Sequence, residues 1–253
     1  HHTLAMKLFP VPAGSITGSN TVCQGQTGVA FACPAITGAD SYIWTLPPGA
    51  TITSGSGTNA IVVSFDLTAQ PGILTVKGHS NDCGDGTPAS LPVTVNPLPA
   101  GAAAITGAST VCQAQTGVAY TLPAIANATG YQWALPPGAT GSSTTNSISL
   151  DFSASATSGN ITVLGTNQCG SGPVAVFPVT VNPLPVAAGT ITGPSEVCQN
   201  QSGVAFSVPA ITYATSYFWS LPTGISIASG AGTNSILANV AVNAASGTVT
   251  VTG

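Results

Sequence analysis

The sequence predicts an all-β protein made of tandem antiparallel β-sandwich units, each closed by one disulfide. Three observations predict this fold class. One segment recurs three times along the 253 residues, apolar residues alternate with a period of two, and Gly and Pro together supply 50 residues for turns. No segment shows the 3.6-residue period of a helix. Six or seven short strands in about 87 residues, separated by turn residues, are typical of a sandwich.

The repeat is defined by the phrase Ile-Thr-Gly followed by Val-Cys-Gln. Its cysteines are Cys23, Cys112 and Cys198, which lie 89 and 86 positions apart. The single tryptophan of each unit keeps the same two steps. Self-similarity at a fixed period indicates an array in which each repeat is one structural unit.

The closing phrase Val-Thr-Val-Asn-Pro-Leu-Pro sets the expected boundaries of the units. We expect sandwich units at 13–99, 100–185 and 186–253, preceded at 1–12 by the end of an earlier repeat or a linker. Leu8–Pro12 stands where the closing phrase of a preceding unit would be. The third unit is expected to stop before its last strand, so that the sequence is a window on a longer array.

Within the first unit, alternating apolar residues predict five strands. The first covers 29–33, the second contains 42–44 and ends at a Leu-Pro turn, and the third covers 60–65. The fourth covers 72–78, and the closing phrase at 93–99 supplies the fifth. Alternation of this kind places every second side chain in the core.

The charge of the chain excludes several functions. Only 3% of the residues are charged, with two Lys, while Thr and Ser together supply 60 of the 253 residues. Two cations cannot neutralise the phosphates of a nucleic acid or hold an anionic membrane surface. Apolar runs have the length of strands, so no spanning helix and no membrane insertion are expected. The apolar fraction of 43% is enough to bury a core.

The titratable residues do not predict an enzyme. Of the three histidines only His79 lies within a repeat, and no carboxylate position is kept across the three units. Catalysis needs titratable groups that converge, and repeating parts cannot supply them here. We therefore expect no catalytic residues and no cofactor.

The cysteine spacing predicts one bridge within each unit. Cys23 and Cys83 bracket most of the first unit, and Cys112 and Cys169 do the same in the second. Closing loops of this length would stabilise each unit by about 4 kcal/mol in the chain-entropy model. Cys198 is then half of a bridge whose partner lies past residue 253.

Two features could be taken for metal ligands. Asp82 and Asp85, with Asn81, form a weak calcium candidate, but the second unit has no acid there, which favours a solvated loop. Cys33 stands where the other units have Leu122 and Val208, so a buried free thiol is expected. No cysteine pair has the short spacing of a zinc site.

The tryptophans allow two interpretations. A tryptophan in the middle of a strand is typical of a sandwich core packed beside a disulfide, whereas an exposed tryptophan could stack on a sugar. The position in the strand favours the core. The residues concerned are Trp44, Trp133 and Trp219.

The phrases VCQGQTGVAF, SYIWTLPPGATITSG and VTVNPLP resemble the PKD-like, immunoglobulin-like repeats of very large surface proteins of Bacteroidota. The resemblance covers residues 13–253. It implies tandem sandwiches in the stalks of secreted or cell-surface adhesins, gliding-associated proteins or multidomain hydrolases exported by the type IX system. The family's usual Trp-Asp-Phe-Gly-Asp-Gly motif is absent, since each tryptophan here is followed by Thr, Ala or Ser and then Leu-Pro.

These observations predict a structural stalk or spacer in an extracellular, cell-surface protein. Its expected partners are neighbouring repeats of the same chain. Two alternatives stay open: a module of a secreted hydrolase that binds carbohydrate or a partner, and a fibre subunit that assembles with identical chains. Surface polysaccharide and identical chains are the partners that these alternatives imply.

Overall fold

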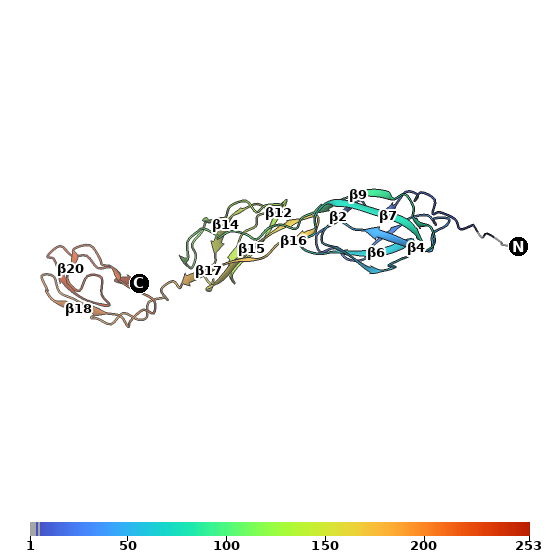
Figure 1. The fold of residues 1–253 in the computed structure, drawn as a ribbon. Helices are drawn as coiled ribbons and strands as arrows, with labels where there is room; N and C mark the ends of the chain where they lie inside the picture. Colours follow the sequence, from blue (N-terminus) through green and yellow to red (C-terminus); the bar gives the residue numbers. More distant parts are fainter. Residues whose placement is uncertain (1–3, 5) are drawn as a thin grey trace.

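The computed structural model describes residue 4 and residues 6–253, so residues 1–3 and 5 of the predicted leading segment lie outside it. Three β-sandwich units follow one another in a row (Figure 1). The described residues form strands and turns without helices. This part of the chain contains no helix that is long and apolar enough to cross a membrane.

The first unit packs a four-stranded sheet against a five-stranded sheet around one core. The strands of one sheet, in order, are β1 (Thr17–Gly18), β3 (Val29–Ala32), β6 (Ala60–Phe65) and β5 (Ala50–Ser54). The strands of the other are β2 (Thr21–Cys23), β9 (Ala89–Asn96), β7 (Gly72–Ser80) and β4 (Ser41–Thr45), with β8 (Gly84–Asp85) paired to the end of β7. All pairs are antiparallel except β2 with β9, which is parallel.

The second unit repeats this arrangement. Its first sheet has the order β11 (Val118–Thr121), β14 (Ser147–Phe152) and β13 (Ala139–Thr140). Its second sheet has the order β10 (Thr110–Cys112), β17 (Ala175–Asn182), β15 (Gly159–Asn167) and β12 (Gly130–Ala134), with β16 (Gly170–Ser171) on β15. An isolated bridge between Thr106 and Thr121 takes the place of the β1–β3 pair.

The third unit has a full first sheet and a reduced second sheet. The first sheet has the order β18 (Val204–Ser207), β21 (Ser235–Val240) and β20 (Ile225–Ser229). The second is the pair β19 (Phe218–Ser220) and β22 (Thr250–Thr252). Among the described residues, no strand of this unit corresponds to β9 or β17.

The core of each unit comes from the alternating residues that the sequence predicted. In β6, Ile61, Val63 and Phe65 are buried while the residues between them are more exposed. The same alternation holds in β14 and β21. Because the two inner faces of a sandwich meet, these residues form one apolar cluster in each unit.

The repeated Ile-Thr-Gly phrase has a packing reason. A Cβ atom on Gly18 would lie 2.4 Å from a ring carbon of Phe31, and one on Gly107 would lie 2.2 Å from a ring carbon of Tyr120. Contacts this short between carbon atoms do not occur. Only glycine therefore lets the chain pass across the aromatic ring at the edge of each first sheet.

The predicted strands agree with the observed ones at their centres. The expected strand at 60–65 coincides with β6, and the one at 72–78 extends to Ser80 in β7. The closing strand begins earlier than expected, at Ala89, and ends at Asn96. The expectation missed β2, whose three residues are too few to show alternation. The pairing of β2 with β9 places Cys23 at the end of the unit where the chain leaves it.

Candidate functional site

The junction between the first two units is the feature that sets this chain apart from a string of separate domains. A disulfide joins Cys23 to Cys169, with the two Cα atoms 5.4 Å apart and 146 positions between them in the sequence. The bridge therefore links one unit to the next. The predicted bridges within units, Cys23 to Cys83 and Cys112 to Cys169, are therefore wrong. Cys83 and Cys112 carry free thiols.

The sheet topology explains the correction. Cys23 ends β2 and pairs with Asn96, the last residue of β9, so it lies where the chain leaves the first unit. Cys83 lies in the turn after β7, and the β7 residue Val76 pairs with Ala89 at the start of β9. We call these two ends of a unit the trailing end (Cys23 and Asn96) and the leading end (the β7–β8 turn, residues 80–86). The cysteines of one unit thus lie at opposite ends, about a strand length apart.

The leading end of the second unit lies against the trailing end of the first. Figure 1 shows β16, which follows the second unit's turn, beside the end of the first unit that carries β2. Cys169 is the second unit's counterpart of Cys83, and it meets Cys23 across this junction. The Asn-Pro-Leu-Pro linker starts at Asn96, the residue that pairs with Cys23, so the bridge lies directly beside the linker.

Polar contacts hold the same junction. The side-chain amide of Asn167 donates to the carbonyl oxygens of Pro97 and Asn127, each at 2.9 Å. Its own oxygen accepts the backbone N–H of Cys169 at 2.8 Å. In the linker, the N–H of Leu98 donates to Oε1 of Gln24 at 3.2 Å. The Asn167 side chain therefore holds Cys169 next to the linker at Pro97, and Gln24 holds the linker at Leu98.

At the second junction, the residues that the structure describes repeat the linker contact. The N–H of Leu184 donates to Oε1 of Gln113 at 3.1 Å, as Leu98 does to Gln24. Cys112, the counterpart of Cys23, is exposed and carries a free thiol. Cys198, which the sequence predicts as half of a bridge, is likewise exposed and free among the described residues.

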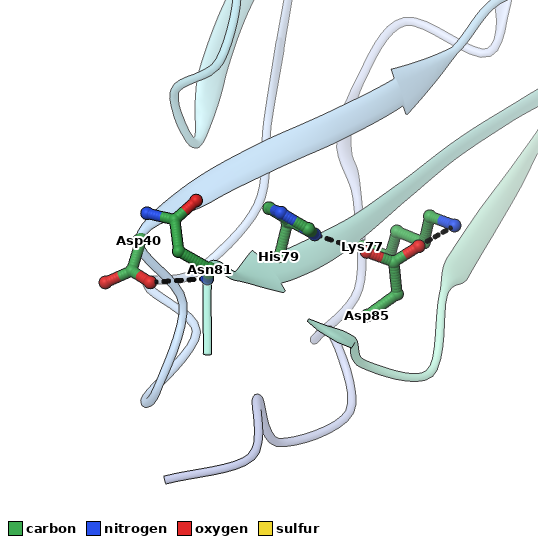
Figure 2. Close-up of polar contacts among 5 residues, drawn as sticks. All are labelled: Asp40, Lys77, His79, Asn81 and Asp85. Carbon is green, nitrogen blue, oxygen red and sulfur yellow. Dashed lines mark hydrogen bonds and ion pairs between the residues drawn. The ribbon is translucent and has the colours of Figure 1, made fainter. Parts of the chain in front are cut away.

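Most charges of the chain gather at the leading end of the first unit. The Asp85 carboxylate contacts the Lys77 ammonium and lies 2.6 Å from Nδ1 of His79 (Figure 2). Beside them, Oδ2 of Asp40 accepts the backbone N–H of Asn81 at 2.8 Å. The contacts of Asp85 join β8 to β7, since His79 pairs with Asp85 in the sheet. The Lys77 ammonium, followed by the His79 ring, lowers the pKa of Asp85 below its ordinary value.

The calcium candidates Asp82 and Asp85 each have a cationic partner of the chain's own. Asp82 forms an ion pair with Lys7 at 2.9 Å, and Asp85 holds Lys77 and His79. Within residue 4 and residues 6–253, no group of three or more His, Cys, Asp or Glu side chains lies close enough to hold a metal ion. The arrangement is that of a paired charge cluster on the surface, with the Lys77, His79 and Asp85 side chains 34–38% exposed.

The three tryptophans connect the two sheets of each unit. Trp219 is buried, whereas Trp44 and Trp133 are half-buried against the core. Each indole N–H donates to a backbone oxygen in the turn before β6, β14 or β21, on Thr58, Thr145 or Thr233, at 2.8–3.0 Å. An indole held in this way has a structural role in the sandwich. The expected packing beside a disulfide does not apply, since the bridge lies between units.

Cys33 fills a core position of the first unit. It is 4% exposed, and its counterparts Leu122 and Val208 are 3% exposed each. Burial raises the pKa of its thiol. The residue therefore acts as a small apolar side chain, in line with the expectation from its strand position.

A comparison with known protein families agrees with the three repeats. The sequence profile of the PKD-like domain family matches residues 9–93, 98–179 and 184–253. No curated protein matches the chain. Among solved structures, the chain is similar to the I-band fragment I67-I69 from titin, with 15% identity, 92% of this chain and 86% of that chain covered, and a TM-score of 0.43.

The chain is also similar to FdeC, described as a broadly conserved Escherichia coli adhesin, with 14% identity, 91% of both chains covered and a TM-score of 0.31. Domains of the PKD-like and immunoglobulin-like type are generally non-catalytic modules, and in tandem they are typical of structural or adhesin-like extracellular proteins. The same strand order recurs along the chain, and the family profile matches it three times. The chain therefore belongs to the PKD-like domain family, with three such domains in tandem.

Proposed function

We propose that the chain is a stalk segment of a large cell-surface protein, of the adhesin type and exported by the type IX system of Bacteroidota. Its task is to hold a functional module at a distance from the cell. The observation that carries this proposal is the bridge between consecutive units, Cys23 to Cys169. A spacer needs stiff joints more than it needs stable domains, and a covalent link across a joint supplies stiffness directly.

The linker chemistry supports the same role. Pro97 and Pro99 fix their backbone φ angles and hold the preceding residues in extended conformations. Leu98 between them is tied to Gln24 of the first unit. A joint restrained by two prolines, one hydrogen bond and one disulfide resists bending better than a flexible polar linker does.

The bridge also supports an extracellular location. Disulfides form and persist in oxidising compartments and are rare in the cytosol. A surface dominated by Thr and Ser, with two Lys and no Arg, gives trypsin-like proteases few cleavage sites. Both properties suit an exposed stalk.

Small-angle X-ray scattering of the chain at low concentration, oxidised and reduced, tests the proposal. We expect an elongated particle with a maximum dimension on the order of 100 Å, from three units of about 30 Å each. Reduction should broaden the distribution of dimensions by freeing the first joint. A compact particle, or saturable binding on a glycan array, would contradict the stalk and favour a binding module.

A further inference from the structure

The bridge between the first two units shortens the covalent path along the chain. Cys23 and Cys169 are 146 positions apart in the sequence, while their Cα atoms are 5.4 Å apart. Because the units lie in a row (Figure 1), a pull along the row acts before Cys23 and after Cys169 and is transmitted through the sulfur–sulfur bond. Residues 24–168 form a closed loop that this path bypasses. Fully extended, a stretch of that length would span roughly 500 Å.

Most of both hydrophobic cores lies in the bypassed loop. In the first core, all the buried residues except Ile16 and Val22 belong to residues 24–168. In the second core the exceptions are Val179 and Val181. The Asn-Pro-Leu-Pro linker between the two units lies in the loop as well. Tension that passes through the bridge therefore pulls neither on this linker nor on the strands that supply most of each core.

One short segment crosses the first unit and stays in the path under tension. The chain enters at the leading end, where a Cβ atom on Gly86 would lie 2.8 Å from the backbone oxygen of Pro10. It reaches the trailing end at Cys23, thirteen positions after that proline. Thirteen extended residues span about 45 Å at most, against about 30 Å for a unit. The segment therefore has little length to release.

A segment of the same size crosses the second unit. It starts with Cys169 at the leading end, runs through β16 and β17, and ends with Asn182 at the trailing end. Asn182 pairs with Cys112, as Asn96 pairs with Cys23 in the first unit. Because β17 is already an extended strand, a pull along it adds little length. Each of the two units is thus crossed by one nearly extended segment.

We propose that the Cys23–Cys169 bridge is a redox-controlled lock on the length of the stalk. The work that tension does is the force multiplied by the length released. While the bridge is closed, unfolding of the first two units would release almost no length along the path, so tension leaves them folded. Once the bridge is reduced, the path runs through residues 24–168, and the same tension unfolds both units. The inference rests on the proposed stalk function, which is the source of the tension.

Reduction by a small dithiol opens the lock. Both cysteines of the bridge are half-buried, so they are partly exposed to a reductant in solution. A thiolate of the dithiol attacks one sulfur, forms a mixed disulfide and releases the other cysteine as a thiolate. The second thiol of the reductant then displaces the bound cysteine and closes a disulfide within the reductant. The chain gains two electrons and two protons as two thiols, and the dithiol becomes a disulfide.

The test is magnetic tweezers on the chain 1–253, tethered at both ends through peptide tags that do not use cysteine. Under a rising force, we expect the oxidised chain to lengthen only through residues outside 24–168. Addition of dithiothreitol should add roughly 500 Å of contour length. The double variant Cys23→Ser and Cys169→Ser should show this length without a reductant. No gain, or a gain of roughly 200 Å as for a loop closed by Cys23 and Cys83, would overturn the proposal.

A second measurement shows whether the first unit unfolds under tension. Cys33 lies in the bypassed loop and is 4% exposed, so a maleimide reaches its thiol only after the core opens. The free thiols outside the core are first replaced by serine, at Cys83, Cys112 and Cys198. In this background the bridged chain should stay unlabelled at a force at which the chain with Cys23→Ser and Cys169→Ser is labelled. Equal labelling of the two chains at that force would overturn the proposal.

Two comparisons separate the lock from folding and from the stalk. Without tension neither chain should be labelled at Cys33, which shows that both are folded. If the unbridged chain is labelled without tension, the contour length of the unmodified chain before and after dithiothreitol decides. A compact particle in the scattering experiment would contradict the stalk and leave the lock unaffected. Labelling of the bridged chain under tension would contradict the lock and leave the stalk unaffected.

Discussion

The two junctions of the chain share a linker and differ in their covalent chemistry. In both, a leucine N–H of the Pro-Leu-Pro linker donates to a glutamine, Gln24 in the first and Gln113 in the second. The first junction adds the Cys23–Cys169 bridge and the hydrogen bonds of Asn167. The same linker hydrogen bond is thus present with and without a bridge between the units, so the linker conformation does not depend on the bridge.

The largest expected effect comes from removing the bridge itself. The double variant Cys23→Ser and Cys169→Ser should lower the free energy of unfolding of the first two units by about 2–4 kcal/mol, because the unfolded chain regains freedom. It should also widen the range of orientations at the first junction, although the hydrogen bond from Asn167 to Pro97 remains. Thermal unfolding and scattering measure the two effects. As a control, Cys112→Ser changes an exposed free thiol and should alter neither the free energy of unfolding nor the scattering.

The next effect comes from Asn167. Asn167→Ala removes three hydrogen bonds that tie the second unit's leading end to Pro97, Asn127 and Cys169. We expect a loss of about 1–3 kcal/mol, since the partner groups lose their bonds near the joint. Chemical denaturation gives the value. The matched control is Asn81→Ala at the first unit's leading end, and an equal loss there would show that the asparagine serves its own turn rather than the junction.

The linker contact should contribute less. Gln113→Ala removes the acceptor of Leu184 N–H and a donor to the Ala156 carbonyl, for an expected loss of about 1 kcal/mol. Residual dipolar couplings should show a wider range of orientations between the second and third units. Gln24→Ala makes the same change at the first junction, where the bridge should keep the orientations narrow. Equal broadening at both junctions would contradict the role given to the bridge.

The smallest effect concerns the charged leading end of the first unit. The pKa of Asp85 is lowered by Lys77 and His79, so its ionised form is favoured in the folded state. A lowered folded pKa contributes stability above the unfolded value of about 4, and this stability is lost as the pH falls through the folded pKa. Asp85→Asn should therefore reduce the melting temperature slightly at pH 6 and not at pH 2. An equal reduction of the melting temperature at pH 2 and pH 6 would show that the ionisation of Asp85 is not the cause.

The sequence predicted the sandwich well because the fold rests on local alternation. Ile61, Val63 and Phe65 face the core because every second position of their strand is apolar, and this pattern can be read from the sequence. These signals lie within a few residues of one another. They are visible in one strand without knowledge of its neighbours.

The cysteine pairing could not be predicted in the same way. It depends on β2, a strand of three residues whose parallel pairing with β9 places Cys23 at the trailing end. Spacing along the chain favours a bridge within each unit, while the distance in space favours one between units. The charge cluster could not be predicted either, because Asp85 contacts Lys77 and His79 only when β8 pairs with β7.

Peptide mapping without reduction tests the central claim most directly. The oxidised chain would be digested with pepsin, which does not depend on the two lysines, and the linked peptides identified by mass spectrometry. The structure predicts a linked pair that contains Cys23 and Cys169, with Cys33 and Cys112 recovered as thiols. A linked pair that contains Cys23 and Cys83 would place the bridge within one unit and contradict a covalently stiffened joint.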